Sequence, residues 1–134
     1  MLTRSISLKQ ALDKLTSYLD LERNWDSYDA DPISPLAITL AQALLLMLDR
    51  KYAGQHSDRL FFVGPSPDGG VMLEWRREMS GIEQSLEIWV DSDGRFEFLI
   101  TDEPNISDSW LEGPLEGLLD ARTTIYSFLV AENV

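Results

Sequence analysis

The chain has 134 residues, of which 44% are hydrophobic and 25% are charged, a composition typical of one globular domain with a substantial core. Its 23 acidic residues against 11 lysines and arginines give a net charge of −12, which argues against binding to nucleic acid or to an anionic membrane and favours a basic partner. The absence of cysteine excludes disulfides and thiolate metal sites. Because the N-terminal residues also lack the apolar segment of a signal peptide, the sequence predicts a cytoplasmic protein.

Two helices are predicted in the first part of the chain. Ser7 and Gln10 form a capping-box pattern, and apolar residues then recur at helical spacing to about Leu21. The second helix is predicted to begin at the Ser34–Pro35 pair and to end near Tyr52 to Gly54. It is apolar nearly all round, which is typical of a central helix buried against a sheet.

A polar loop from Asn24 to Ser34 separates these helices and carries two large rings, Trp25 and Tyr28. The rings either plug the edge of the core, which is the plainer interpretation, or form a recognition surface. The loop also carries three aspartates: Asp26, Asp29 and Asp31. Their spacing resembles a calcium loop, but the glycine and the terminal glutamate of that motif are missing, so no metal site is predicted.

An antiparallel meander of four strands is predicted to follow the helices. The expected strands alternate apolar with polar residues between turn signals, at Leu60–Val63, Val71–Arg77, Ser85–Val90 and Arg95–Ile100. One sheet face is then apolar and the other charged, with Trp89 on the charged side. Residues 101–113 are predicted as an acidic loop that contains Trp110, and Pro114 as the start of a last helix. The prediction is a single α+β domain, 1–134, with the second and third helices on one sheet face.

Few residues suit catalysis. The only histidine, His56, lies in a polar connector, and no nucleophile-elbow or phosphate-binding pattern is present. We therefore expect no catalytic residue, no cofactor and no metal. The alternative is a small carboxylate-dependent hydrolase or ligand-binding domain that uses Asp68 and Glu74, although chance proximity of carboxylates is expected in so acidic a chain.

Two motifs carry a resemblance that runs in order along nearly the whole chain. The first is Asn24-Trp25-Asp26-Ser27-Tyr28 followed by Ala30-Asp31-Pro32-Ile33, and the second is Pro65-Ser66-Pro67-Asp68-Gly69-Gly70-Val71 followed by Leu73-Glu74-Trp75. Together they resemble a family of small, uncharacterised bacterial proteins, in which Gly commonly stands at the position of Asp29. The resemblance implies a single bacterial domain and assigns a function to none of its residues.

The sequence favours a non-enzymatic binding protein, of the antitoxin, immunity-protein or inhibitor kind, that occupies a basic protein partner. The candidate contact residues are aromatic anchors and aspartates: Trp25, Asp26, Tyr28, Asp29, Asp31, Asp68, Trp89 and Trp110. A further possibility is a homodimer through the charged sheet face, where Trp89 would form an apolar island with Met72 and Leu99. The alternative to this dimer is that Arg76 and Arg95 cover Trp89 within the monomer. The alternative to a basic partner is that the acidic charge only keeps the protein in solution.

Overall fold

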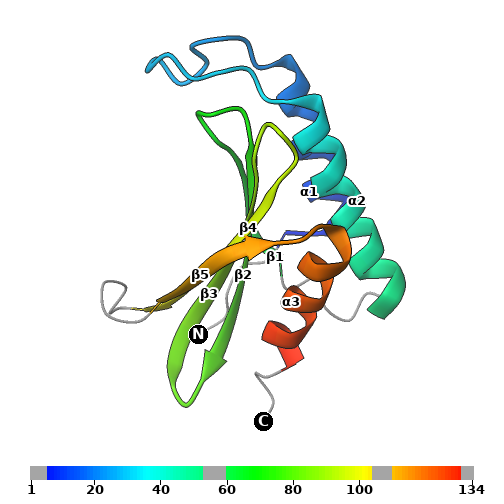
Figure 1. Ribbon diagram of the computed structural model, residues 1–134, viewed down its shortest axis with the longest axis vertical. Coiled ribbons are helices and arrows are strands. Elements are labelled where there is room, and N and C mark those ends of the chain that lie inside the picture. Colours follow the sequence, from blue (N-terminus) through cyan, green and yellow to red (C-terminus); the bar gives the residue numbers. More distant parts are fainter. Residues whose placement is uncertain (1–5, 53–59, 104–109, 131–134) are drawn as a thin grey trace.

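The computed structural model describes residues 6–52, 60–103 and 110–130, which form three α-helices on one side of a five-stranded antiparallel sheet (Figure 1). The elements are α1 (Leu8–Ser17), the 3-10 turn η1 (Tyr18–Asp20), α2 (Pro35–Tyr52), β1 (Leu60–Pro65), β2 (Val71–Met79), β3 (Ile82–Val90), β4 (Phe96–Glu103), β5 (Trp110–Leu115) and α3 (Leu118–Val130). The predicted α+β class is confirmed, with one strand more than predicted. His56 and the side chain of Trp110 lie outside the described residues. Within the described ranges, no helix has the length and apolar character needed to span a membrane.

The first helix starts where the capping-box pattern predicts. The Ser7 hydroxyl accepts a hydrogen bond from the Gln10 amide at 3.1 Å, and the Gln10 side chain accepts one from the Ser7 amide at 3.0 Å. The buried side of α1 carries Ala11 and Leu15, and η1 extends the helical segment to Asp20. This arrangement confirms the predicted helix and satisfies two amides that would otherwise lack partners.

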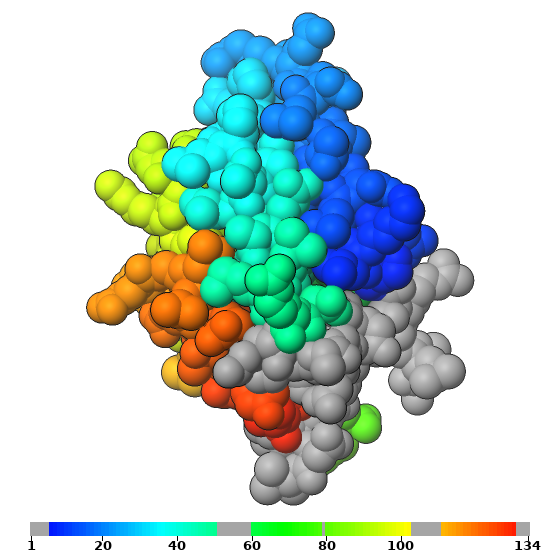
Figure 2. Space-filling model, turned by 90° about the vertical axis from the view of Figure 1, so that its right-hand side faces the viewer, coloured from blue at the N-terminus to red at the C-terminus, as the bar shows by residue number. Residues whose placement is uncertain are grey.

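The second helix, α2, lies between α1 and α3 on the covered side of the sheet (Figure 2). Ser34 caps its start by accepting a hydrogen bond from the Ala37 amide at 3.3 Å. Leu36 and Leu46 are about half exposed, so the helix is buried along one side and not all round. The buried side faces the sheet and carries Ala37, Ile38, Ala41, Leu44, Leu45 and Leu48.

The strands pair in chain order, and their register separates the two faces of the sheet. Leu73, Ile88 and Phe98 lie side by side under the helices, whereas Met72 and Trp89 lie side by side on the opposite face. The covered face contributes the sheet's share of the hydrophobic core. The predicted alternation between an apolar face and a charged face is therefore confirmed, as is the placement of Trp89.

The fifth strand corrects the prediction for the end of the sheet. Trp110–Leu115 pairs with β4 at the sheet edge, where residues 101–113 are predicted as a loop and Pro114 as a helix start. Gly113 and Pro114 do not predict a strand, because both residues weaken a strand interior. They are tolerated here because β5 is an edge strand. The last helix consequently begins later than predicted, at Leu118.

The last helix, α3, is fixed at both ends. Gly117 has a φ of 148°, and the Asp120 carboxylate accepts a hydrogen bond from the Glu116 amide at 2.9 Å. Near the other end, Arg77 of β2 donates to the Phe128 carbonyl at 2.8 Å, and its guanidinium lies 4.1 Å from the centre of the Phe128 ring. These contacts hold α3 on the same sheet face as α2, as the sequence predicts.

The strand β1 forms one edge of the sheet, and several of its outward backbone positions are protected. The Leu60 carbonyl accepts a hydrogen bond from the Ile6 amide at 2.8 Å, the Val63 carbonyl accepts one from the Tyr18 hydroxyl at 3.2 Å, and Pro65 has no N–H to offer. Burial raises the pKa of Tyr18 to about 12, so its hydroxyl remains a donor well above neutral pH. Such features discourage another chain from pairing with the edge.

Candidate binding surfaces

The loop between η1 and α2 contains five of the eight predicted contact residues: Trp25, Asp26, Tyr28, Asp29 and Asp31. Its first ring, Trp25, packs against the core and donates from Nε1 to the Asp31 carbonyl at 2.7 Å. Of the two interpretations left open for this ring, packing at the core edge is the one that agrees with these contacts. Trp25 is therefore occupied in holding the loop.

Asp26 shapes the tip of this loop. Its Oδ1 accepts hydrogen bonds from the Tyr28 amide at 2.8 Å and from the Ala30 amide at 3.1 Å. Ser27, between them, has a φ of 68°, a conformation that is uncommon for a residue with a side chain. The result is a tight tip on which the Tyr28 side chain is 88% exposed. Tyr28 is thus the more accessible of the two rings in the loop.

The other two aspartates pair with Arg23. Its guanidinium contacts Asp29 at 3.2 Å and Asp31 at 3.0 Å, and hydrogen bonding and charge from Asp29 raise the pKa of Arg23. All three side chains are exposed, so these pairs stabilise the loop only modestly. Asp29 has a φ of 67°, which glycine adopts freely and aspartate tolerates. The glycine expected here from the family resemblance is therefore compatible with the same loop conformation.

The loop rests on the turn that precedes β2. The Asp31 amide donates to the Pro67 carbonyl and the Ser34 amide to the Gly69 carbonyl, each at 2.8 Å. Gly69 has a φ of 95°, and a Cβ added there would lie 3.2 Å from a backbone oxygen of the loop. The two sequence motifs are therefore in direct contact at one end of the molecule (Figure 1).

Asp68 is bonded within this turn. Its Oδ1 accepts hydrogen bonds from the Ser66 hydroxyl at 2.8 Å and from the Gly70 amide at 3.1 Å. Glu74 lies three residues into β2, about 10 Å along the extended strand from its first residue. The described contacts give Asp68 and Glu74 separate hydrogen-bond partners, and their use as a pair stays a prediction.

The side of the sheet turned away from the helices, here called the open face, carries acidic and apolar side chains. Its strand register places on it Met72, Glu74, Arg76, Glu87, Trp89, Glu97, Leu99 and Glu112. Met72 lies directly opposite Trp89, and Leu99 is a diagonal neighbour of Trp89 on the next strand. The predicted apolar island is therefore present, and carboxylates surround it.

Glu87 is a half-buried carboxylate near the middle of the open face. It lies directly opposite Glu74 in the ladder, and Nε1 of Trp89 donates to its Oε1 at 2.9 Å. Burial raises the pKa of Glu87; the hydrogen bond from Trp89 opposes this rise, and the charge of Glu74 adds to it. Arg76 donates to Glu74 at 2.9 Å and lies 3.6 Å from Glu83. No cation of the described residues pairs with Glu87.

Arg76, one of the two arginines that the alternative prediction places over Trp89 with Arg95, does not cover this ring. Its guanidinium lies instead over Phe61, 3.7 Å from the ring centre, because the bond to Glu74 draws it toward β1. A hollow of about 250 Å³ lies beside Trp89. It is lined by Trp89, Glu97, Phe98, Leu99, Glu112 and Gly113.

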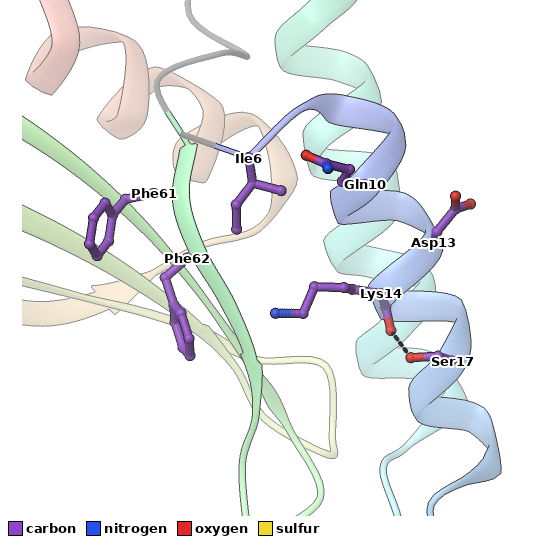
Figure 3. Close-up of a pocket in the computed structure, with 7 residues that line it drawn as sticks. All are labelled: Ile6, Gln10, Asp13, Lys14, Ser17, Phe61 and Phe62. Carbon is purple, nitrogen blue, oxygen red and sulfur yellow. Dashed lines mark hydrogen bonds between the residues drawn. The ribbon is translucent and has the colours of Figure 1, made fainter. Parts of the chain in front are cut away.

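A larger groove of about 730 Å³ separates α1 from β1 (Figure 3). It is lined by Ile6, Gln10, Asp13, Lys14, Ser17, Phe61 and Phe62. The sequence pattern does not reveal this groove, because both phenylalanines reach it through a register shift in β1 between Leu60 and Phe62. The one available signal is the pair of consecutive phenylalanines, which a strictly alternating strand would place on opposite faces.

Comparisons with known proteins leave the identity of the chain open. No model of a known protein family matches it, and neither does any curated protein or any solved structure. Among the residues that the structure describes, no group of three or more histidines, cysteines, aspartates or glutamates is placed to hold a metal ion. The family resemblance stays a prediction, and the function is proposed from the geometry.

Proposed function

We propose that this protein is a non-enzymatic binding module that holds a basic segment of a partner protein on its open face. The observation that carries the proposal is Glu87, a half-buried carboxylate that faces Glu74 and pairs with no cation in the described part of the chain. The nearby Arg76 is bonded to Glu74 instead. Two like charges directly opposite each other in a sheet are unfavourable, and the bond from Arg76 to Glu74 offsets part of this repulsion. A lysine or arginine from a partner would neutralise Glu87 and remove this repulsion.

Trp89 supplies the aromatic part of the proposed contact. A cation placed over an indole ring is attracted by its π-electrons, and tryptophan is frequent among the residues that dominate binding energy. The hollow of about 250 Å³ beside the ring has Glu97 on its border, so it offers both an aromatic wall and a negative charge to one cationic side chain. The net charge of −12 would speed the encounter with such a partner.

The same charges argue against the homodimer as the function of this face. A two-fold contact through the open face would bring the carboxylates of Glu74, Glu87 and Glu97 in one copy close to those in the other, and like charges brought together weaken association. Sedimentation of the wild-type protein and of Trp89→Glu tests this alternative. We expect both to run as monomers, whereas a dimer that only the wild type forms would favour self-association.

The carboxylate-dependent enzyme has weaker support, because Asp68 is engaged in its own turn and Glu74 in its bond to Arg76. An antitoxin, immunity-protein or inhibitor role in the cytoplasm remains our proposal for the biological setting. Such roles need a surface that attracts and covers a basic partner, and they need no catalytic group.

A calorimetric titration with a hexa-arginine peptide at low salt tests the proposal. The test variant carries both Glu87→Gln and Glu97→Gln. The control variant carries both Glu22→Gln and Asp93→Asn, which also removes two charges but from exposed loop positions. The first should weaken binding about tenfold, a change of about 1.4 kcal/mol, and the control about twofold at most. Equal weakening in the two would mean that net charge alone attracts the peptide, and the proposal would then be wrong.

A further inference from the structure

We propose a second binding site in the groove between α1 and β1, for a small organic acid that carries a carboxylate on an apolar body. This site adjoins the open face at β1 but uses other residues, and it does not depend on the open-face contact. The volume of about 730 Å³ falls within the range of small-molecule sites, roughly 300–1,000 Å³. The chemistry of the two walls and the charge between them indicate the class of ligand.

The wall formed by β1 is apolar. Ile6 lies between the strand and α1, and the Phe62 side chain is 40% exposed beside it (Figure 3). The position of the Phe62 ring depends on Gly64, because a Cβ added at Gly64 would lie 2.7 Å from Cε2 of that ring. An exposed aromatic side chain held in this way offers contact area to an apolar ligand body.

The wall formed by α1 is polar and presents one cation to the groove. Gln10, Asp13, Lys14 and Ser17 follow the i, i+3, i+4, i+7 spacing of a single helical stripe. Lys14 extends toward β1, whereas the Asp13 carboxylate points away from the groove (Figure 3) and is bound by Lys9 at 2.8 Å. The charge exposed inside the groove is therefore positive.

Lys14 has no carboxylate partner among the described residues, although the chain contains 23 acidic residues. Its Nζ lies 5.4 Å from the centre of the Phe62 ring. An amine placed beside an exposed aromatic ring can bind the carboxylate of a ligand whose apolar body covers that ring. The same positive charge would repel a basic peptide, so this groove and the open face select opposite ligand charges.

An added β-strand fits this groove less well than a small molecule does. The Ile6 amide and the Tyr18 hydroxyl already bond the outward carbonyls of Leu60 and Val63, and Pro65 has no N–H. A peptide that pairs with a sheet edge depends on those backbone groups for its affinity. We therefore assign the groove to a ligand that needs only the Lys14 amine and the apolar wall.

The test is an NMR titration of the ¹⁵N-labelled protein with decanoate below its micelle concentration. Three further compounds separate the need for a negative charge from the need for an apolar chain. Acetate has the charge without the chain, decanol has the chain without the charge, and decyltrimethylammonium has the chain with the opposite charge. We expect decanoate to shift the amides of Lys14 and Phe62 at concentrations where the other three do not. Shifts confined to residues outside the groove, or equal shifts with decyltrimethylammonium, would overturn the proposal.

Two charge-matched variants complete the test. Lys14→Gln removes the cation in the groove, and Arg50→Gln removes an exposed cation on α2 outside it. We expect Lys14→Gln to weaken decanoate binding about fivefold or more, and Arg50→Gln to leave it within about twofold. Equal affinities in the two variants would show that Lys14 does not hold the carboxylate. Hexa-arginine binding to the open face should be unchanged in both, which separates this site from the proposed function.

Discussion

The loop between η1 and α2 and the open face of the sheet are both rich in carboxylates, but they use them differently. In the loop, Asp26 bonds two backbone amides, and Asp29 and Asp31 share Arg23. On the open face, Glu87 faces Glu74 and receives one hydrogen bond, from a tryptophan. The loop therefore uses its acidic groups in bonds within its own structure, whereas Glu87 on the sheet pairs with no cation in the described part of the chain.

The difference follows from the geometry of the backbone. A short Asp side chain in a loop can turn back and accept hydrogen bonds from amides a few residues away. Side chains on one face of a strand meet only their neighbours on that face, so the carboxylate of Glu87 depends on what the adjacent strands present to it. The residues directly opposite it are Glu74 on β2 and Leu99 on β4. The diagonal neighbour Arg76 is a cation, but it is bonded to Glu74.

The largest expected effect is on the loop, from Trp25→Ala. The substitution removes a packed ring and the bond to the Asp31 carbonyl, and should lower the free energy of unfolding by about 3 kcal/mol. Trp25→Phe keeps most of the packing and should lose about 1 kcal/mol. Urea unfolding followed by circular dichroism measures both. A loss below about 1 kcal/mol for Trp25→Ala would mean that the ring does not hold the loop.

The next effect separates the aspartates of the loop from one another. Asp26→Ala leaves the Tyr28 and Ala30 amides without their acceptor and should lower the free energy of unfolding by about 2 kcal/mol. Asp29→Ala breaks only an exposed ion pair and should lower it by less than about 1 kcal/mol. The same urea experiment applies. Equal losses for the two variants would contradict the distinct role given to Asp26.

A smaller effect of opposite sign is expected on the open face, from Glu87→Gln. The variant removes the repulsion from Glu74 and keeps an oxygen for the Trp89 N–H. We expect the free energy of unfolding at pH 7 to rise by about 0.2–1 kcal/mol. A decrease in the free energy of unfolding would show that the ionised Glu87 stabilises the fold. It would contradict the unfavourable interaction proposed between Glu87 and Glu74.

The dependence of this effect on pH follows from the raised pKa of Glu87. Below its ordinary pKa of 4.5 the carboxyl is protonated in both the folded and the unfolded protein, so the wild type and Glu87→Gln should be equally stable there. As the pH rises from 4.5 through the raised pKa of the folded state, the wild type loses stability that the variant keeps. Unfolding measured across this range should show the two curves separating, and parallel curves would contradict the assignment.

The smallest expected effect is that of Tyr28→Ala. The side chain is 88% exposed, so the free energy of unfolding should change by no more than about 0.5 kcal/mol. The affinity for hexa-arginine should stay the same, because the open face carries the proposed contact. A loss of affinity with unchanged stability would move the binding site from the sheet to the loop.

Much of the fold could be predicted because its signals are local. The capping box at Ser7 and the N-cap at Ser34 mark helix starts, and strict alternation placed Trp89 on the charged face. The strand β5 could not be predicted in the same way. Gly113 and Pro114 are acceptable there only because the strand lies at the edge, a fact that depends on the whole sheet.

The candidate sites depended more on contacts between distant residues. The sequence suggested an acidic rim in the loop, but Arg23 lies close enough to neutralise two of its aspartates only once the loop has folded. The importance of Glu87 depends on the register that sets it opposite Glu74. The groove beside Lys14 depends on the shift in β1, which no periodic pattern reveals.

The most direct test of the open-face contact is a titration with hexa-arginine in which the indole N–H signals are followed by ¹H–¹⁵N NMR. Single Trp→Phe variants assign these signals. The Trp89 signal should move, because its N–H bonds the carboxylate that the peptide would neutralise. The Trp25 and Trp75 signals should stay, since one donates to a loop carbonyl and the other is fully buried. A stationary Trp89 signal, with shifts confined to the amides around Tyr28, would contradict the account.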